Sequence, residues 1–168
     1  MASKSSFDVT TGVDLQEVDN AVNQAHKEIQ HRYDFRGTHC TLELDRAGGV
    51  VRLGADDEFR LQALGAVFKE KLSRRGVPLS NVRFGEHEAA AGQAVRCTVS
   101  LTQGIDQDTA RRIVKLIKED GGFKKIQASI HGDQVRVTGP KKDELQRVMQ
   151  LLREHDFGME LSFGNYRD

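Results

Sequence analysis

The chain has 168 residues, with 25 Lys and Arg balanced by 25 Asp and Glu, 38% hydrophobic residues and a mean hydropathy of -0.54. This apolar content suffices for a hydrophobic core and excludes a wholly disordered chain, and the zero net charge means that any polyanion site has to be a local basic cluster. No stretch approaches the roughly 20 apolar residues of a transmembrane helix, and the chain starts without the apolar segment of a signal peptide, so we expect a cytoplasmic protein with no membrane partner. Cys40 and Cys97 form no CxxC pair, so neither a disulfide nor a zinc site is expected.

The chain contains the same pattern twice. When the sequence is shifted by 92 positions against itself, residues 6–14 align with residues 98–106, and the apolar positions of the segments that follow align as well. Both copies show the alternation of a strand, then a Gly-Val-Asp or Gly-Ile-Asp turn, then apolar residues at helical spacing. Asp14 and Asp106 are predicted to cap the two helices at their N-termini.

The later part of each copy matches at a shift of 84 positions, which aligns residues 51–53 with residues 135–137. A turn-forming segment precedes each of these strands and predicts a β-hairpin. A second amphipathic helix follows in both copies, and a last strand completes each of them at residues 82–85 and 161–164.

Each copy therefore has the order β-α-β-β-α-β. This order is the ferredoxin-like α+β plan, a four-stranded antiparallel sheet with both helices on one face. A segment rich in Ala, Gly and Glu at residues 85–93 is the best boundary, which predicts a first domain of residues 1–91 and a second of residues 92–168. The pattern leaves open whether the first strand of each copy pairs within its own domain or is exchanged with the other.

The alternation of the strands makes the open sheet face of the second copy polar and mildly basic, with Arg136 on it. An RNA-recognition motif has this topology but stacks bases on aromatic residues of its central strands. Neither residues 49–53 nor residues 133–137 include an aromatic residue. Phe7 aligns with an inward-facing valine and is expected in the core.

Basic residues of the second copy form the main candidate site. They lie on the solvent side of its first helix and along the path to its second helix: Arg111, Arg112, Lys115, Lys118, Lys124, Lys125, Lys141 and Lys142. Lys141 and Lys142 are predicted at a helix start, where cations oppose the helix dipole. A bound phosphate would be favoured there by the helix N-terminus and by the two lysines. The alternative is a solvated charged face with Asp143 and Glu144 as local partners.

The first copy has eight additional residues between its first helix and its second strand, around residues 31–37. Asp34, Phe35 and Arg36 provide a carboxylate, an aromatic ring and a guanidinium there, a combination that suits a guanine edge or a phosphate. The structural alternative has Phe35 in the core and Asp34 paired with Arg36.

Several ordered motifs resemble those of the bacterial YajQ family. They are Ser6-Phe7-Asp8, Asp34-Phe35-Arg36-Gly37, Gln103-Gly104-Ile105, and residues 113–118, 132–139 and 163–168. The resemblance runs from end to end and implies two ferredoxin-like domains that bind nucleotides and RNA. It also implies that cyclic di-GMP is a possible ligand, since some members of the family are receptors for it that influence transcription.

Carried over by position, the resemblance marks as binding residues Asp34, Phe35, Arg36, Lys115, Arg136, Thr138, Lys141 and Arg167. The chain has Val95 where family members often have a bulky aromatic residue. A stacking contact on a purine at that position would therefore be absent.

We expect a nucleotide-binding protein that is not an enzyme, with cyclic di-GMP or GTP held by the basic cluster and the loop of residues 34–36. RNA binding, or a protein-interaction role that regulates transcription through a transcription factor, is the alternative. The chain lacks Walker A, GxSxG and HExxH motifs, an acylphosphatase-like arginine loop, and metal-ligand spacing among its six His residues. Neither a cofactor nor a metal is expected.

Overall fold

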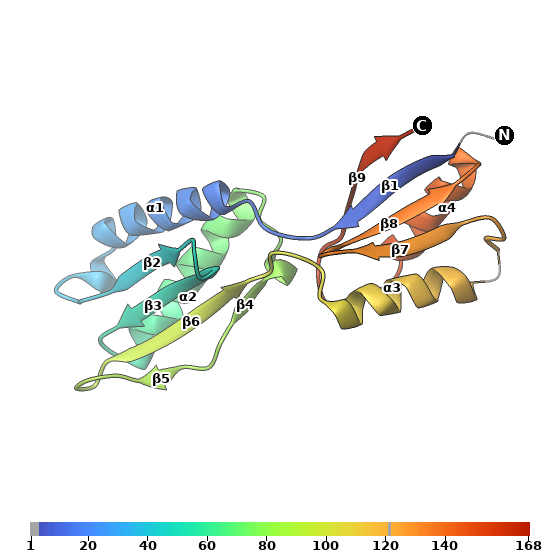
Figure 1. Ribbon diagram of the computed structural model, residues 1–168. Helices are drawn as coiled ribbons and strands as arrows, with labels where there is room; N and C mark the ends of the chain where they lie inside the picture. The colour runs from blue at the N-terminus through green and yellow to red at the C-terminus, as the bar shows by residue number, and fades with distance from the viewer. Residues whose placement is uncertain (1–3, 121) are drawn as a thin grey trace. The chain divides into compact units, whose positions relative to one another are not determined.

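The structure, a computed structural model, describes residues 4–120 and 122–168. The chain forms two compact units. The central unit consists of residues 13–103, and the terminal unit combines, among the described residues, 4–12 with 104–120 and 122–168. The first and the last described segments therefore both belong to the terminal unit (Figure 1).

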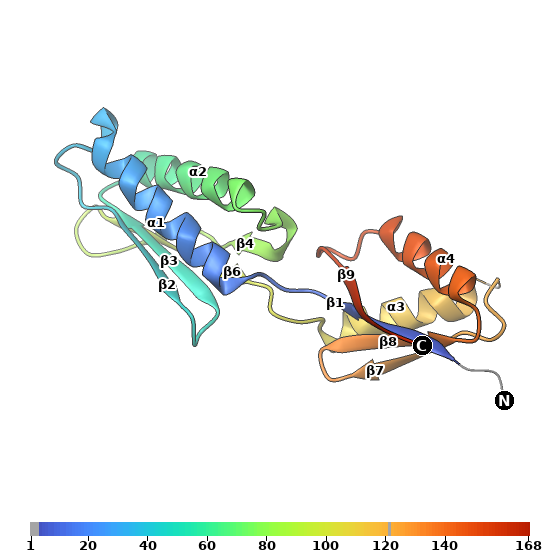
Figure 2. The ribbon, with the colours of Figure 1, turned by 90° about the horizontal axis from the view of Figure 1, so that it is seen from above.

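The terminal unit has a four-stranded antiparallel sheet in the order β7-β8-β1-β9 (Figure 1). Its two helices cover one face of this sheet, and the other face is open (Figure 2). The elements in chain order are β1 (Ser5–Thr10), α3 (Gln107–Glu119), β7 (Gln127–His131), β8 (Gln134–Gly139), α4 (Lys142–Arg153) and β9 (Ser162–Arg167).

The central unit has the same architecture, with the strand order β2-β3-β6-β4 and a short strand β5 that also pairs with β6. Helices α1 and α2 pack on one face of the sheet (Figure 2). The elements are α1 (Leu15–His31), β2 (Thr41–Asp45), β3 (Val50–Ala55), α2 (Glu58–Arg74), β4 (Val82–Phe84), β5 (Glu88–Ala89) and β6 (Val95–Leu101), with short 3-10 helices at Tyr33–Phe35 and Leu79–Asn81.

The predicted α+β class with two ferredoxin-like sheets is confirmed, but the units do not divide the chain at residue 91. Strand β1 lies in the sheet of the terminal unit, and β6 lies in the sheet of the central unit. Strand β1 therefore lies in the sheet covered by α3 and α4, which follow β6 in the chain. Strand β6 lies in the sheet covered by α1 and α2, which follow β1. The sequence left this exchange open because both strands offer the same alternation of apolar residues to either sheet.

The strand registers also refine the alignment of the two copies. Val9 pairs with Val135 and Phe163, and Val99 pairs with Val51 and Phe84. Val9 is therefore the structural equivalent of Val99, although the shift of 92 positions places Phe7 there. Accordingly, Asp106 at the start of α3 follows Val99 by seven residues, whereas Asp14 at the start of α1 follows Val9 by five.

Three of the four long helices begin with an aspartate cap. The carboxylates of Asp14, Asp57 and Asp106 accept hydrogen bonds from backbone N–H groups in the first turns of α1, α2 and α3. The predictions for Asp14 and Asp106 are confirmed. Helix α4 differs, because its N-cap is Lys141, whose side chain forms no capping hydrogen bond.

Strand β1 is fixed in its sheet by apolar burial and by one ion pair. The side chains of Phe7 and Val9 are completely buried in the core of the terminal unit, as predicted for Phe7. Asp8 is 4% exposed, and its carboxylate accepts hydrogen bonds from Arg136 Nε at 3.0 Å and from Asn165 Nδ2 at 2.6 Å. Burial raises the pKa of Asp8, but these hydrogen bonds and the charges of Arg136 and Arg167 lower it more, so the pKa lies below its usual value.

We predict that Asp8→Asn lowers the free energy of unfolding at pH 7 by about 1–3 kcal/mol, because Arg136 loses its charged acceptor. A carboxyl whose pKa is depressed by folding stabilises the protein above its unfolded pKa of about 3.9, and this contribution is lost as the pH falls through the lower native pKa. The difference between wild type and Asp8→Asn should therefore shrink below about pH 4, as measured by urea unfolding at a series of pH values.

Asp45→Asn is the matched control for this prediction, because Asp45 binds Arg52, the residue equivalent to Arg136, at an exposed site. Asp45→Asn should lower the free energy of unfolding much less than Asp8→Asn does. Equal losses in the two variants would contradict the importance assigned to the buried pair.

Candidate functional site

The cations predicted in the second copy lie on two opposite sides of the terminal unit. Val135 and Val137 are buried under the helices, so Arg136 and Thr138 point to the open face of the sheet. The register places Thr138 and Arg167 on either side of Ser6 in one row across β8, β1 and β9. The sheet thus brings together three of the predicted binding residues.

Helix α3 carries the second group of cations, and it lies on the helix-covered side of the sheet. Arg111, Lys115 and Lys118 are exposed there. Arg111 binds Asp108 at 3.2 Å, and Lys115 lies 4.0 Å from Glu119. Exposed pairs of this kind contribute little to stability and are typical of a solvated helix face. The predicted single cluster is therefore divided, and α3 is its peripheral part.

A pocket of about 280 Å³ lies where the start of α4 meets the beginning of β1 and the end of β9. We call it the α4–β9 pocket; it is lined by Ser5, Ser6, Lys142, Leu145, Gln146, Met149, Tyr166, Arg167 and Asp168. Leu145 and Met149 are buried and supply an apolar floor. The ring of Tyr166 is 63% exposed, so one of its faces is available to a planar ligand.

Charged groups flank this pocket. Lys142 Nζ donates to Asp168 Oδ1 at 2.8 Å, and the hydroxyl of Ser5 lies 3.5 Å from the same oxygen. The hydrogen bond and charge of Lys142 lower the pKa of Asp168. Among the described residues, Arg167 forms no ion pair within 4.0 Å. An anion in the pocket could therefore use Arg167 directly and could take the place of Asp168 on Lys142.

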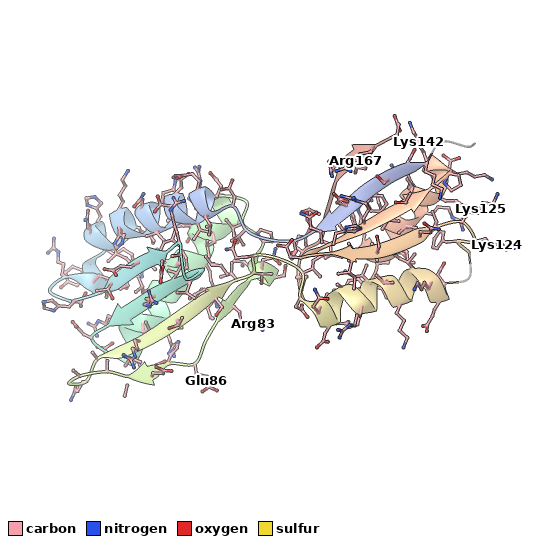
Figure 3. The ribbon with its side chains drawn as sticks, in the orientation of Figure 1. Arg83, Glu86, Lys124, Lys125, Lys142 and Arg167 are labelled. Carbon is pink, nitrogen blue, oxygen red and sulfur yellow. The ribbon has the colours of Figure 1, made fainter. Side chains whose placement is uncertain are left out.

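Further cations lie along the same end of the terminal unit. Figure 3 shows Lys124 and Lys125 near the start of β7, at the end of the unit that also carries Lys142 and Arg167. The segment with Lys124 and Lys125 lies against the end of β8, since a Cβ added to Gly139 would overlap the side chain of Ile126. Lys141 is the N-cap residue of α4 and precedes Lys142. We call Lys124, Lys125, Lys141 and Lys142 the basic rim of this end.

The central unit offers an internal comparison for this site. The starts of α2 and α4 align, so Lys141 and Lys142 correspond to Asp57 and Glu58. Two cations of the terminal unit therefore replace two acids of the central unit at the first turn of equivalent helices.

The same inversion occurs on the strands. Phe84 and Phe163 are equivalent, because they pair with Val99 and Val9. By spacing along the chain, Glu88 then corresponds to Arg167, and His87 corresponds to Tyr166. The fold alone does not require positive charge at these positions, since the central unit forms the same sheet with negative charge there.

The loop of residues 34–36 belongs to the central unit, where most of its groups have structural partners. Phe35 is 5% exposed in the core, and Arg32 binds both oxygens of Asp34, at 3.0 and 2.7 Å. The expected pairing of Asp34 with Arg36 was wrong, because the Asp34 carboxylate forms its ion pair with Arg32, which follows α1. Arg36 instead lies over the exposed ring of Tyr33, 5.6 Å from its centroid.

Sequence reasoning missed the apolar and aromatic part of the α4–β9 pocket. Leu145 and Met149 lie on the core side of α4, and Tyr166 lies in the last motif of the chain, but no local pattern joins them. A comparison of equivalent positions in the two copies, Tyr166 with His87 and Lys142 with Glu58, could have found the site. Equivalent positions of a repeat that differ in side-chain chemistry indicate that the two copies have different functions.

Neither a metal centre nor a membrane helix is present in the described part of the chain. Within residues 4–120 and 122–168, no three His, Cys, Asp or Glu side chains are grouped to hold a metal ion. No helix in these same ranges is long and apolar enough to cross a membrane.

The fold defines a protein of two ferredoxin-like units, and Lys142 and Arg167 line a pocket in one of them. The family described as nucleotide-binding protein YajQ-like matches residues 5–167, and the chain belongs to this family. Three relatives named "Nucleotide-binding protein" are similar over nearly their whole length. They are 45% identical in Heliobacterium modesticaldum over 99% of both chains, 50% in Syntrophotalea carbinolica over 96% of this chain and 98% of the relative, and 48% in Magnetococcus marinus over 97% and 99%.

We predict that the loop of residues 34–36 separates into structural and surface roles. Phe35→Ala should lower the free energy of unfolding by about 3–5 kcal/mol, because it removes a buried ring from the core. Arg36→Ala should change it by less than about 0.5 kcal/mol, because Arg36 contacts only an exposed tyrosine among the described residues. Chemical denaturation of both variants measures this, and a large loss with Arg36→Ala would contradict the assignment.

Proposed function

We propose that the chain binds an anionic nucleotide in the α4–β9 pocket and catalyses no reaction on it. The observation that carries this proposal is the charge inversion between the two units. Lys142 and Arg167 line the pocket, and the equivalent positions of the central unit are Glu58 and Glu88. A fold that accepts acids at these positions carries bases in the terminal unit, and bases there favour a phosphate.

The lining of the pocket suits the parts of a nucleotide. Lys142 and Arg167 would bind the phosphate, and the N-terminal end of α4, where Lys142 lies, would favour its negative charge. The exposed face of Tyr166 would stack on the base, which contributes about 1–3 kcal/mol for a base on an aromatic side chain. Leu145 and Met149 would exclude water beneath it.

Cyclic di-GMP and GTP are the two ligands we put first. Each has more than one phosphate, and the open sheet face next to the pocket offers further groups. Ser6 lines the pocket and pairs with Thr138, and Arg136 follows in the next row of the sheet. With one phosphate bound to Lys142, a second phosphate of the same ligand would contact these residues of the sheet face.

RNA is the second candidate ligand. The rim of Lys124, Lys125, Lys141 and Lys142 extends beyond the pocket and would contact a phosphate backbone. The two ligand classes differ in salt dependence, because a single strand contributes a log-log slope of about -0.7 for each phosphate contact. A regulatory interaction with a transcription factor would follow nucleotide binding in this proposal, as the step that reports the bound ligand.

We predict that Lys142→Glu combined with Arg167→Glu, which restores the charges of the central unit, weakens binding of labelled cyclic di-GMP or GTP about tenfold or more. Tyr166→Ala should weaken it as well through loss of stacking. Equilibrium titration by fluorescence anisotropy at several salt concentrations measures both effects.

Lys118→Glu is the control for added negative charge, since Lys118 lies on α3 and is not among the residues that line the pocket. It should leave nucleotide affinity unchanged. Wild-type affinity in a well-folded Lys142→Glu, Arg167→Glu protein would reject the pocket. Binding of tRNA with a steep salt slope, and of no small nucleotide, would favour the RNA alternative.

A further inference from the structure

The central unit contains a pocket of about 290 Å³ at the position equivalent to the α4–β9 pocket. We call it the Gly65 pocket; it is lined by Leu53, Leu61, Gln62, Gly65, Ala66, Lys69, Phe84, His87 and Cys97. Leu61 and Gln62 correspond to Leu145 and Gln146 of the terminal unit, so the two pockets are related by the repeat. The two pockets differ in the lining residues that determine their free volume and their charge.

Gly65 keeps this pocket open. It lies in the middle of α2, where glycine is less stable than alanine because it loses more backbone freedom. The backbone there does not require glycine, since an added Cβ would meet only the ring of Phe84 at 3.8 Å, an ordinary contact. The equivalent residue in α4 is Met149, which is buried. The fold therefore accepts a large side chain at this position, and packing does not explain the glycine.

The interior of the Gly65 pocket is apolar. Leu53, Leu61 and Cys97 are buried beneath it, and the ring of Phe84 forms one wall. Burial raises the pKa of the Cys97 thiol, so it is uncharged at neutral pH and adds to the apolar floor. A ligand body that fits this interior is an aromatic ring or a branched alkyl group.

Lys69 gives the pocket its charge. Its ammonium lies 4.5 Å from the centroid of the Phe84 ring and has no ion-pair partner within 4.0 Å among the described residues. The nearby acids are already engaged, because Glu58 contacts His87 and Glu88 binds Arg96 at 3.3 Å. The pocket thus combines an apolar interior with one cation that has no ion-pair partner and with the amide of Gln62, whose Nε2 also donates to Glu58 Oε1 at 3.3 Å.

We infer that the Gly65 pocket binds a small organic acid, with an aromatic or branched apolar body and a single carboxylate. The body would pack between Gly65 and Phe84, and the carboxylate would bind Lys69 and Gln62. The lack of further cations distinguishes this site from the α4–β9 pocket. A nucleotide would leave most of its phosphate charge unpaired here.

Three probes of the same shape test this inference: phenylpropanoate, phenylpropanol and phenylpropylamine. We expect saturable binding of phenylpropanoate to the full chain, followed by amide shifts of Gly65 and Cys97 in two-dimensional NMR. Phenylpropanol should bind about threefold to fivefold more weakly because it loses the exposed ion pair, and phenylpropylamine should bind most weakly.

Two variants assign the site. Gly65→Met places in α2 the residue that α4 carries, and should abolish binding while preserving the fold. Lys69→Met should reduce the affinity for phenylpropanoate to that of phenylpropanol and leave phenylpropanol binding unchanged. Lys118→Met, on α3, is the control for removal of a surface lysine and should bind like wild type.

Gly65→Ala is the second variant in case the methionine disturbs the fold, and should weaken binding by narrowing the pocket while raising thermal stability. Wild-type binding of phenylpropanoate to a folded Gly65→Met protein would overturn the inference, as would equal affinity for all three probes. Absence of shifts at Gly65 and Cys97 at saturating probe would overturn it as well.

Discussion

The burial of β1 in the terminal unit is the constraint on which the rest of the structure depends. Phe7 and Val9 complete the core beneath α3 and α4, and Asp8 binds Arg136 and Asn165 on the opposite face of the same strand. Strand β6 does the same for the central unit with Cys97 and Val99. Neither sheet is complete without a strand from the other part of the repeat. The stability of each unit therefore depends on residues that are remote in the chain, and the edges of the α4–β9 pocket are formed by this arrangement.

Much of the fold could be predicted because its determinants are local. The repeat, the alternation of the strands, the hairpins and the aspartate caps at Asp14 and Asp106 all follow from short segments. The exchange of β1 and β6 could not be predicted, since both strands present similar apolar faces. In the candidate site, Lys142 was predicted from its charge and Arg167 from the family resemblance, whereas Tyr166 and Met149 required the packing of β9 against α4. Asp34 was assigned the wrong arginine because two were equally near in sequence.

The two units show how one backbone can carry sites of different character. At equivalent positions the terminal unit has Lys142, Met149 and Arg167, and the central unit has Glu58, Gly65 and Glu88. The exchanges of charge are at exposed positions, whereas the exchange of methionine for glycine is on the buried side of the helix. Leu61 and Leu145, each buried in its own unit, hold each helix on its sheet.

The position of β1 also has a consequence for synthesis on the ribosome. Its sheet partners lie far along the chain, since the bonds of Asp8 to Arg136 and Asn165 span 128 and 157 residues. The central unit becomes complete once β6 has emerged, whereas β1 leaves the ribosome before the other strands of its own sheet. Phe7 and Val9 therefore remain without their core until β8 and β9 have been made. The strand that is synthesised first is therefore among the last to pair in its sheet.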